Sequence, residues 1–103
     1  MSSLGYGFYP SHPGEVIKDE LEERGISQRK FADNIGIGYS VLNEILNGRR
    51  SISTASALMF EAALDIPADS LLKMQMKYNM YMAMKDQTLV EKLKKISRIA
   101  AIF

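Results

Sequence analysis

Apolar residues between positions 26 and 50 recur with the spacing of two short helices that cross. This stretch reads ISQRKFADNIGIGYSVLNEILNGRR. Its apolar residues fall three and four apart, which predicts one helix over residues 28–35 and a second over residues 39–47, joined by a turn at 36–38. The first glycine of the turn permits a sharp change of direction, and Gly48 can end the second helix in a left-handed conformation. We therefore predict two helices that share one core.

The second of these helices has an apolar side and a polar side in helical projection. Val41, Leu42, Ile45 and Leu46 form the apolar side. Tyr39, Ser40, Asn43, Glu44 and Asn47 form the polar side. A polar side that is merely solvated is the plain interpretation. Arg49 and Arg50, which follow this helix, favour the alternative that its polar side reads base edges in the major groove of DNA.

Four further helices are expected around this pair, so the predicted fold class is all-α. Pro13 or Gly14 begins the first, which ends near Arg24 with Gly25 as its stop. Ser53 caps a helix that runs to about Leu64, and a fifth follows over residues 68–84. A capping box over residues 88–91 opens a sixth helix that runs to the C-terminus.

The inner sides of these helices follow from their apolar residues. Val16, Ile17 and Leu21 line the first helix, and Ala55, Leu58 and Ala62 with Phe60 or Met59 line the fourth. The fifth helix is apolar almost all round, more than one small domain can bury. Its surplus residues predict a dimer or partner interface that comprises Leu72, Met76, Met80, Tyr81 and Met84. The sixth helix is amphipathic and basic, and packing onto a dimer is its simplest role; a membrane surface, a partner or DNA backbone are the alternatives.

Composition narrows the class of protein. At 103 residues with 47% hydrophobic and 24% charged residues, the chain suits one soluble globular domain. It lacks cysteine and a long apolar run, so we expect a cytoplasmic protein without a membrane segment. The only histidine, His12, precedes Pro13 and is expected to be a solvated or hydrogen-bonded loop residue. No nucleophile, acid and base pair or set of metal ligands is evident, so we expect no enzyme, no metal and no cofactor.

The net charge of +1 hides an uneven distribution along the chain. Residues 24–50 hold five basic and two acidic side chains, while the first helix holds five acidic side chains and one lysine. This pattern favours a basic DNA side and an acidic far side over an evenly mixed surface.

Several sites for the DNA backbone follow from this arrangement. Gln28, at the first turn of its helix, can hold a phosphate together with free backbone donors, or be a simple surface residue. Asn47, Arg49 and Arg50 follow the reading helix where the duplex backbone should pass, although surface cations are often only solvated. Thr54 is a weaker candidate for the same role.

The spacing of residues 26–50 resembles the helix-turn-helix of the phage repressor and Cro family, also called the Xre type. A longer resemblance covers residues 12–84 and is to the HigA-type antitoxins of HigB/HigA toxin-antitoxin modules. It rests on HPGE at 12–15, NGRRSIS at 47–53, and the series Pro67, Leu71-Leu72, Gln75 and Tyr78. The family often has a tryptophan after the proline, whereas this chain has Leu71 and methionines there.

The resemblance implies a compact five-helix lambda-repressor-like domain for DNA binding and dimerisation at 12–84. The N-terminal arm at 1–11 and the additional basic C-terminal helix at 85–103 lie outside it, and we expect them to be separate segments of the chain. The resemblance also implies a homodimer that binds an inverted-repeat operator in its own promoter and neutralises an mRNA-cleaving HigB-type toxin. Paired reading helices of such a dimer stand about 34 Å apart, one duplex turn.

Within that picture, Tyr39, Ser40, Asn43 and Glu44 are the expected base readers. Asn43 suits adenine and Glu44 suits the amino group of cytosine. A stand-alone repressor without a toxin is the nearest alternative, and a gene for a small basic ribonuclease-like neighbour separates the two. A protein-interaction module with a vestigial helix-turn-helix is a third possibility, which loss of all operator binding would favour.

Overall fold

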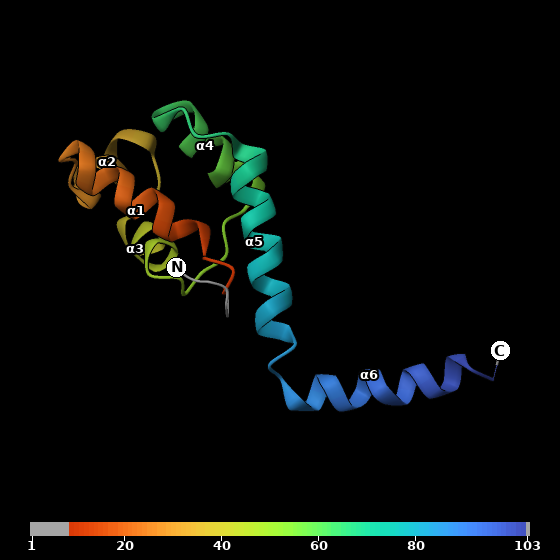
Figure 1. The fold of residues 1–103 in the computed structure, drawn as a ribbon. Coiled ribbons are helices and arrows are strands. Elements are labelled where there is room, and N and C mark those ends of the chain that lie inside the picture. Colours follow the sequence, from red (N-terminus) through yellow and green to blue (C-terminus); the bar gives the residue numbers. More distant parts are fainter. Residues whose placement is uncertain (1–8, 103) are drawn as a thin grey trace.

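Six helices follow one another in the part of the chain that the structure, a computed structural model, describes, which is residues 9–102. They are α1 (Pro13–Arg24), α2 (Gln28–Ile35), α3 (Tyr39–Leu46), α4 (Thr54–Leu64), α5 (Ala68–Ala83) and α6 (Gln87–Ala100). The first four form a rounded body, α5 runs along one side of it, and α6 extends away (Figure 1). This arrangement confirms the all-α prediction of five helices and an additional C-terminal one. Residues 1–8 of the predicted N-terminal arm lie outside the described residues.

Local sequence signals set the ends of α2 and α4 as expected. The Ser27 hydroxyl accepts a hydrogen bond from the backbone N–H of Lys30 at 3.1 Å and so caps α2. Gly36 ends α2 with a φ of 76°, a left-handed conformation that glycine adopts without strain. Ser53 and Ser56 cap α4 reciprocally, each side chain bonding the other's backbone N–H. These contacts satisfy backbone groups that a helix end otherwise leaves unpaired.

A single apolar core holds the five helices α1–α5 together. Its buried residues are Ile17, Leu21, Phe31, Ala32, Leu42, Ile45, Leu46, Ile52, Ala57, Phe60, Leu64, Ala68 and Leu71. The rings of Phe31 and Phe60 stack at its centre with centroids 6.1 Å apart, which fixes α2 against α4. Burial of each large side chain stabilises the fold by about 1.5–3 kcal/mol, so this cluster holds the body together.

The predicted inner side of α4 is wrong except for Phe60. Ser56, Ala57, Phe60 and Leu64 face the core, whereas Leu58 is 53% exposed and Met59, Ala55 and Ala62 also face outward. Because α4 carries apolar residues on every side, its composition does not determine its orientation. Its orientation is set by the Phe31–Phe60 stack and by the capping contact of Ser56.

The predicted capping box at Thr88–Glu91 is also wrong. Helix α6 begins one residue earlier, at Gln87, and its cap is Asp86. The Asp86 carboxylate accepts hydrogen bonds from the backbone N–H groups of Thr88 at 3.0 Å and Leu89 at 3.4 Å. Aspartate caps a helix at least as well as threonine, so the residue that reaches two N–H groups takes the position.

His12 is a buried hydrogen-bonded residue, and the solvated alternative is wrong. Its side chain is 3% exposed, and its Nδ1 accepts a hydrogen bond from the backbone N–H of Gly14 at 2.9 Å, which caps α1. Its ring meets the ring of Tyr78 edge-on, with centroids 5.0 Å apart. Burial lowers the pKa of His12, against the opposing effects of a hydrogen bond with the Arg50 backbone and of the nearby Glu15 carboxylate. His12 thereby connects α1, the loop after α3 and α5.

Helix α5 exposes the methionine surplus that the sequence predicts. Met76, Met80 and Met84 are 56%, 64% and 57% exposed, while Leu71 and Gln75 on its opposite side are buried. Two other predicted interface residues are half-buried within the chain. Leu72 packs against the core, and the Tyr81 ring meets the Tyr9 ring edge-on with centroids 5.6 Å apart. No helix among the described residues is long and apolar enough to cross a membrane.

Candidate nucleic-acid interface

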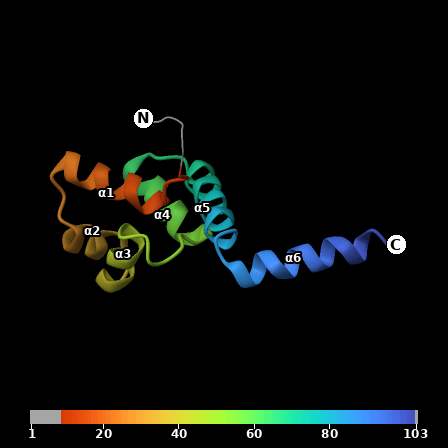
Figure 2. The same cartoon turned by 60° about the horizontal axis from the view of Figure 1, so that its bottom comes forward.

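The pair α2 and α3 lies at one edge of the body, away from α6 (Figure 2). Ala32 is fully buried, and its carbonyl accepts hydrogen bonds from the N–H groups of Gly36 and Ile37 that form the turn. Leu42, Ile45 and Leu46 anchor α3 in the core. The burial of these three residues forces the other side of α3 outward, so the polar side predicted from sequence is the side that solvent reaches.

The four predicted base readers lie together on that side. Tyr39 and Ser40 are exposed, and Asn43 and Glu44 are partly exposed. The guanidinium of Arg29 in α2 lies over the Tyr39 ring, 4.2 Å from its centroid. A cation over an aromatic face is attractive, so Arg29 holds the Tyr39 ring in place. The sequence analysis counted Arg29 only as a positive charge. Its position in the first turn of α2, which faces the start of α3 across the turn, is the feature that could have indicated its contact with Tyr39.

Gln28 and Asn43 form a direct hydrogen bond between α2 and α3. The Asn43 amide donates to Gln28 Oε1 at 3.1 Å. The Gln28 amide N–H groups and the Asn43 amide oxygen are therefore left for other partners. The predicted phosphate contact and the predicted adenine reader thus form one unit, and Gln28 also orients Asn43.

Glu44 and Arg50 form an ion pair at the end of α3. Arg50 Nε and one terminal nitrogen lie 2.8 Å and 2.7 Å from Glu44 Oε1. Both side chains are about half exposed, at 43% and 50%, so the pair contributes at most about 1 kcal/mol to folding. Its main effect is geometric, since it holds the Arg50 cation beside the polar side of α3.

The remaining predicted backbone contacts lie on the segment that leaves α3. Asn47 is exposed, and its amide donates to the Asn43 backbone carbonyl at 2.9 Å. Arg49 is exposed, and its backbone N–H donates to the Glu44 carbonyl at 2.8 Å. Thr54 is exposed at the first position of α4. All three side chains are therefore exposed along this edge.

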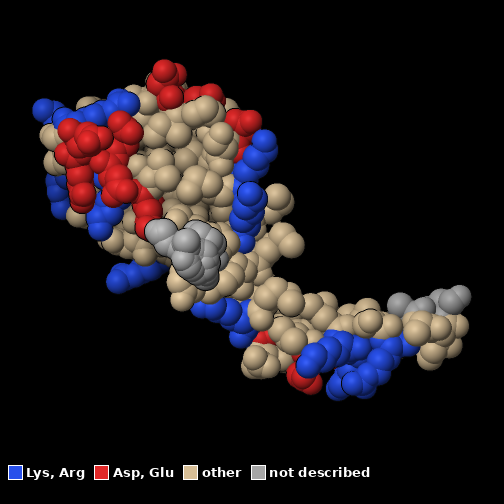
Figure 3. Space-filling model, in the orientation of Figure 1, with Lys and Arg blue, Asp and Glu red and all other residues tan. Residues whose placement is uncertain are grey.

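The surface charge is uneven, and the predicted basic DNA side stays a prediction. Acidic side chains gather over α1, and basic side chains line α6 (Figure 3). Those of α6 are Lys92, Lys94, Lys95 and Arg98. No group of three or more His, Cys, Asp or Glu side chains that can hold a metal ion occurs within residues 9–102.

Residues 17–71 match the family described as Helix-turn-helix. This match covers more than half of the chain. The chain is a helix-turn-helix protein, and its structural relatives include HigA-type antitoxins.

Virulence-associated protein I of Dichelobacter nodosus is 34% identical over 77 residues, which make up 74% of this chain and 71% of that protein. An addiction module antidote protein of a HigA family from Coxiella burnetii has a TM-score of 0.72 and 30% identity, covering 85% of this chain and 95% of its own. The Pseudomonas aeruginosa antitoxin HigA, solved with the higBA promoter, has a TM-score of 0.69 and 27% identity, covering 86% and 92%. The HigA-type resemblance expected from HPGE and NGRRSIS is thereby confirmed.

Proposed function

We propose that this HigA-type chain binds an inverted-repeat operator upstream of its own gene as a homodimer, represses transcription there, and neutralises an mRNA-cleaving toxin of the HigB type. The observation that carries the DNA-binding part is the outward polar side of α3, which is backed by a buried apolar side and flanked by the cations Arg49 and Arg50. A helix of this kind enters the major groove, where base edges are distinct.

Base recognition falls to Tyr39, Ser40, Asn43 and Glu44. The hydrogen bond that the Asn43 amide donates to Gln28 Oε1 orients this amide, so that its oxygen remains free to accept from adenine N6 and its second N–H can donate to N7. Glu44 exchanges its Arg50 partner for a cytosine amino group, or keeps Arg50 at hand for the adjacent phosphate. The aromatic ring of Tyr39, held by Arg29, suits a thymine methyl group.

Backbone contacts set the register of the protein on the duplex. Gln28 lies at the N-terminus of α2 and donates to one phosphate. Its N–H groups are available because the hydrogen bond with Asn43 uses only its side-chain oxygen. Asn47, Arg49, Arg50 and Thr54 follow the next turn of the strand. These contacts supply affinity that falls with salt, because each neutralised phosphate releases counterions.

The exposed methionines of α5 support the dimer. Met76, Met80 and Met84 lie on one side of α5, and burying them against a second copy removes apolar surface from water without disturbing the core. A two-fold dimer places two copies of α3 on successive major grooves, which explains why the operator should be an inverted repeat.

The test of this proposal is a binding titration with the full chain. A labelled duplex of about 30 base pairs that carries the inverted repeat from the gene's upstream region is compared with a scrambled duplex of equal composition. Specific protein–DNA complexes are typically 10³-fold or more tighter than non-specific ones. Equal affinity for the two duplexes at every salt concentration contradicts the proposal.

The toxin part has a separate test, since it shares no step with DNA binding. Co-expression with the neighbouring small open reading frame should yield a complex that stays together through purification. If no basic ribonuclease-like protein is encoded beside the gene, the stand-alone regulator becomes the better account.

A further inference from the structure

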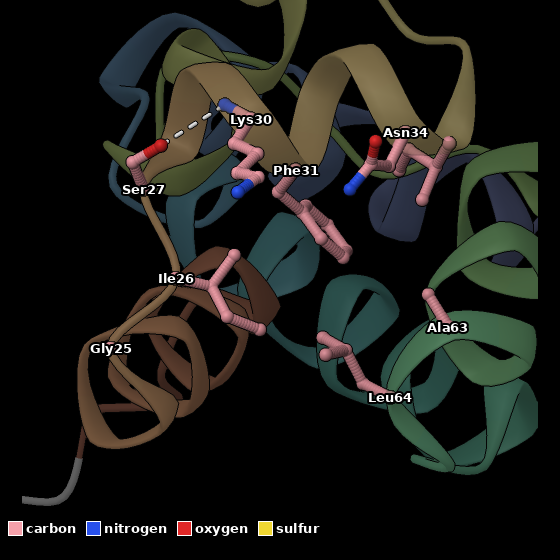
Figure 4. Close-up of a pocket in the computed structure, with 9 residues that line it drawn as sticks. Gly25, Ile26, Ser27, Lys30, Phe31, Asn34, Ala63 and Leu64 are labelled. Carbon is pink, nitrogen blue, oxygen red and sulfur yellow. Dashed lines mark hydrogen bonds between the residues drawn. The ribbon is translucent and has the colours of Figure 1, made fainter.

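A half-open cavity of about 720 Å³ lies on the side of the body formed by the α1–α2 loop, α2 and the end of α4 (Figure 4). Its lining comprises Gly25, Ile26, Ser27, Lys30, Phe31, Asn34, Ile35, Ala63 and Leu64. Its volume falls within the range of small-molecule sites, about 300–1,000 Å³. None of the base-reading or backbone-contacting residues lines it, so it is separate from the DNA interface.

The floor of the cavity is apolar. The Phe31 ring hangs into it from α2, Ile26 enters from the loop, and Leu64 faces both from the end of α4 (Figure 4). A hydrogen bond from the Arg24 guanidinium to the Leu64 carbonyl, 2.9 Å long, ties α1 to the end of α4 next to this floor. The floor of the cavity is therefore fixed by the core and by this bond, whereas Ser27, Lys30 and Asn34 at the rim are exposed.

Its rim, in contrast, presents hydrogen-bond donors. The amine of Lys30 and the amide nitrogen of Asn34 point toward the cavity on either side of the Phe31 ring (Figure 4). Within residues 9–102 Lys30 makes no ion pair, and neither of these two nitrogen atoms has a hydrogen-bond partner. The Ser27 oxygen accepts from the Lys30 backbone, so its own hydrogen remains available to donate.

Three donors, one of them cationic, above an apolar floor match one ligand chemistry. A carboxylate has only acceptors and a single negative charge, and an attached hydrocarbon or aromatic group fills the space beside Phe31. A phosphate ester would bring about two negative charges to a site with one cation. We infer that this cavity binds a small apolar carboxylate, with Lys30, Asn34 and Ser27 on the carboxylate and Phe31, Ile26 and Leu64 on the apolar body.

The experiment uses octanoate as the probe and 1-octanol as its uncharged counterpart of equal chain length. Backbone ¹H–¹⁵N spectra of the full chain are recorded during titration with each. Octanoate should cause saturable shifts confined to residues around the cavity, and octanol should bind about tenfold more weakly. A hydrogen-bonded charge contributes enough for such a ratio.

Variants locate the contacts. Lys30→Gln should weaken octanoate binding about tenfold and leave octanol unchanged, whereas Lys92→Gln on α6 should change neither. Ala63→Leu places a larger side chain in the cavity and should abolish both, whereas Ala55→Leu, on the part of α4 away from this cavity, should not. Circular dichroism establishes that each variant is folded.

Three results would overturn the inference. They are the absence of saturable shifts with octanoate below its micelle concentration, shifts concentrated on the exposed methionines of α5 or on α6, and octanoate affinity that Lys30→Gln leaves intact. None of these readouts involves DNA, so the inference can fail while the proposed DNA binding holds, and the reverse.

Discussion

Replacing Gly14 by alanine tests a close contact between α1 and α3. Helix α1 crosses α3 at Gly14, where a Cβ atom would lie 1.9 Å from the Ile45 carbonyl oxygen and 2.8 Å from its carbonyl carbon. Neither atom belongs to a flexible side chain, so the helices must separate. Its φ is not in the left-handed range, and the requirement for glycine at this position is therefore purely one of space.

The cost can be worked out from three effects. Overpacking a tight core costs about 1–3 kcal/mol. The same Cβ lies 3.0 Å from His12 Nδ1, so the cap that His12 provides is weakened, at a cost of about 1 kcal/mol. Alanine's better helix propensity offsets up to about 1 kcal/mol. We expect a net loss of about 1–4 kcal/mol in the free energy of unfolding, which for a domain of this size lowers Tm by roughly 5–30 °C.

The assay is urea denaturation followed by circular dichroism, supported by a thermal melt. Gly38→Ala is the matched control, because the nearest atom to its added Cβ is Val41 Cγ2 at 3.9 Å. It should stay within about 1 kcal/mol of the original chain. If Gly14→Ala is no less stable than Gly38→Ala, the close approach of α1 to α3 is not present in solution and the reasoning is refuted.

Three further changes probe other parts of the structure. Gln75→Leu should cost about 1–3 kcal/mol in urea denaturation because the buried Gln75 Oε1 accepts from the Ile52 N–H at 2.8 Å, and a loss no larger than that of the exposed control Gln87→Leu would contradict this. Burial lowers the pKa of His12 below its ordinary 6.5, so protonation of His12 favours the unfolded chain. The free energy of unfolding should therefore be highest above pH 6.5 and fall as the pH drops below 6.5. His12→Asn, which keeps a capping oxygen, should flatten that fall between pH 7.5 and 5.5, and an unchanged pH profile would argue against it. Met80→Glu should convert the dimer to a monomer in sedimentation experiments while Met80→Leu leaves it intact, whereas a dimeric Met80→Glu places the interface elsewhere.

The ends of α2 and α4 and the outward polar side of α3 were predictable from sequence because their signals are local. Ser27, Gly36 and Ser53 each act on backbone groups within a few residues, so the spacing along the chain already contains the geometry. The outward side of α3 followed from the opposite apolar side in the same way.

Contacts between distant residues could not be predicted in this manner. Gln75 and Ile52 are far apart in the chain, and only the crossing of α5 over the loop before α4 brings them together. The cavity above Phe31 depends equally on the end of α4. The prediction of the inner side of α4 was wrong for a related reason. A helix that is apolar on every side takes its orientation from its neighbours.

The sequence did not predict how the side chains of the proposed site pair with one another. Gln28 and Asn43 were assigned to phosphate and base separately, whereas the structure joins them by a hydrogen bond. Glu44 and Arg50 were likewise assigned to base and backbone, and they form an ion pair. Side-chain pairing across a turn depends on helix crossing angles, which the spacing of residues in one chain does not specify.

The most direct test of base reading by α3 is a titration of Asn43→Ala against operator duplexes in which each base pair of one half-site is replaced in turn. The account predicts that the original chain loses about 1–3 kcal/mol at one A·T pair and that Asn43→Ala no longer distinguishes the bases at that pair while discriminating normally elsewhere. An equal loss of affinity for every duplex, with discrimination unchanged at all positions, would contradict it.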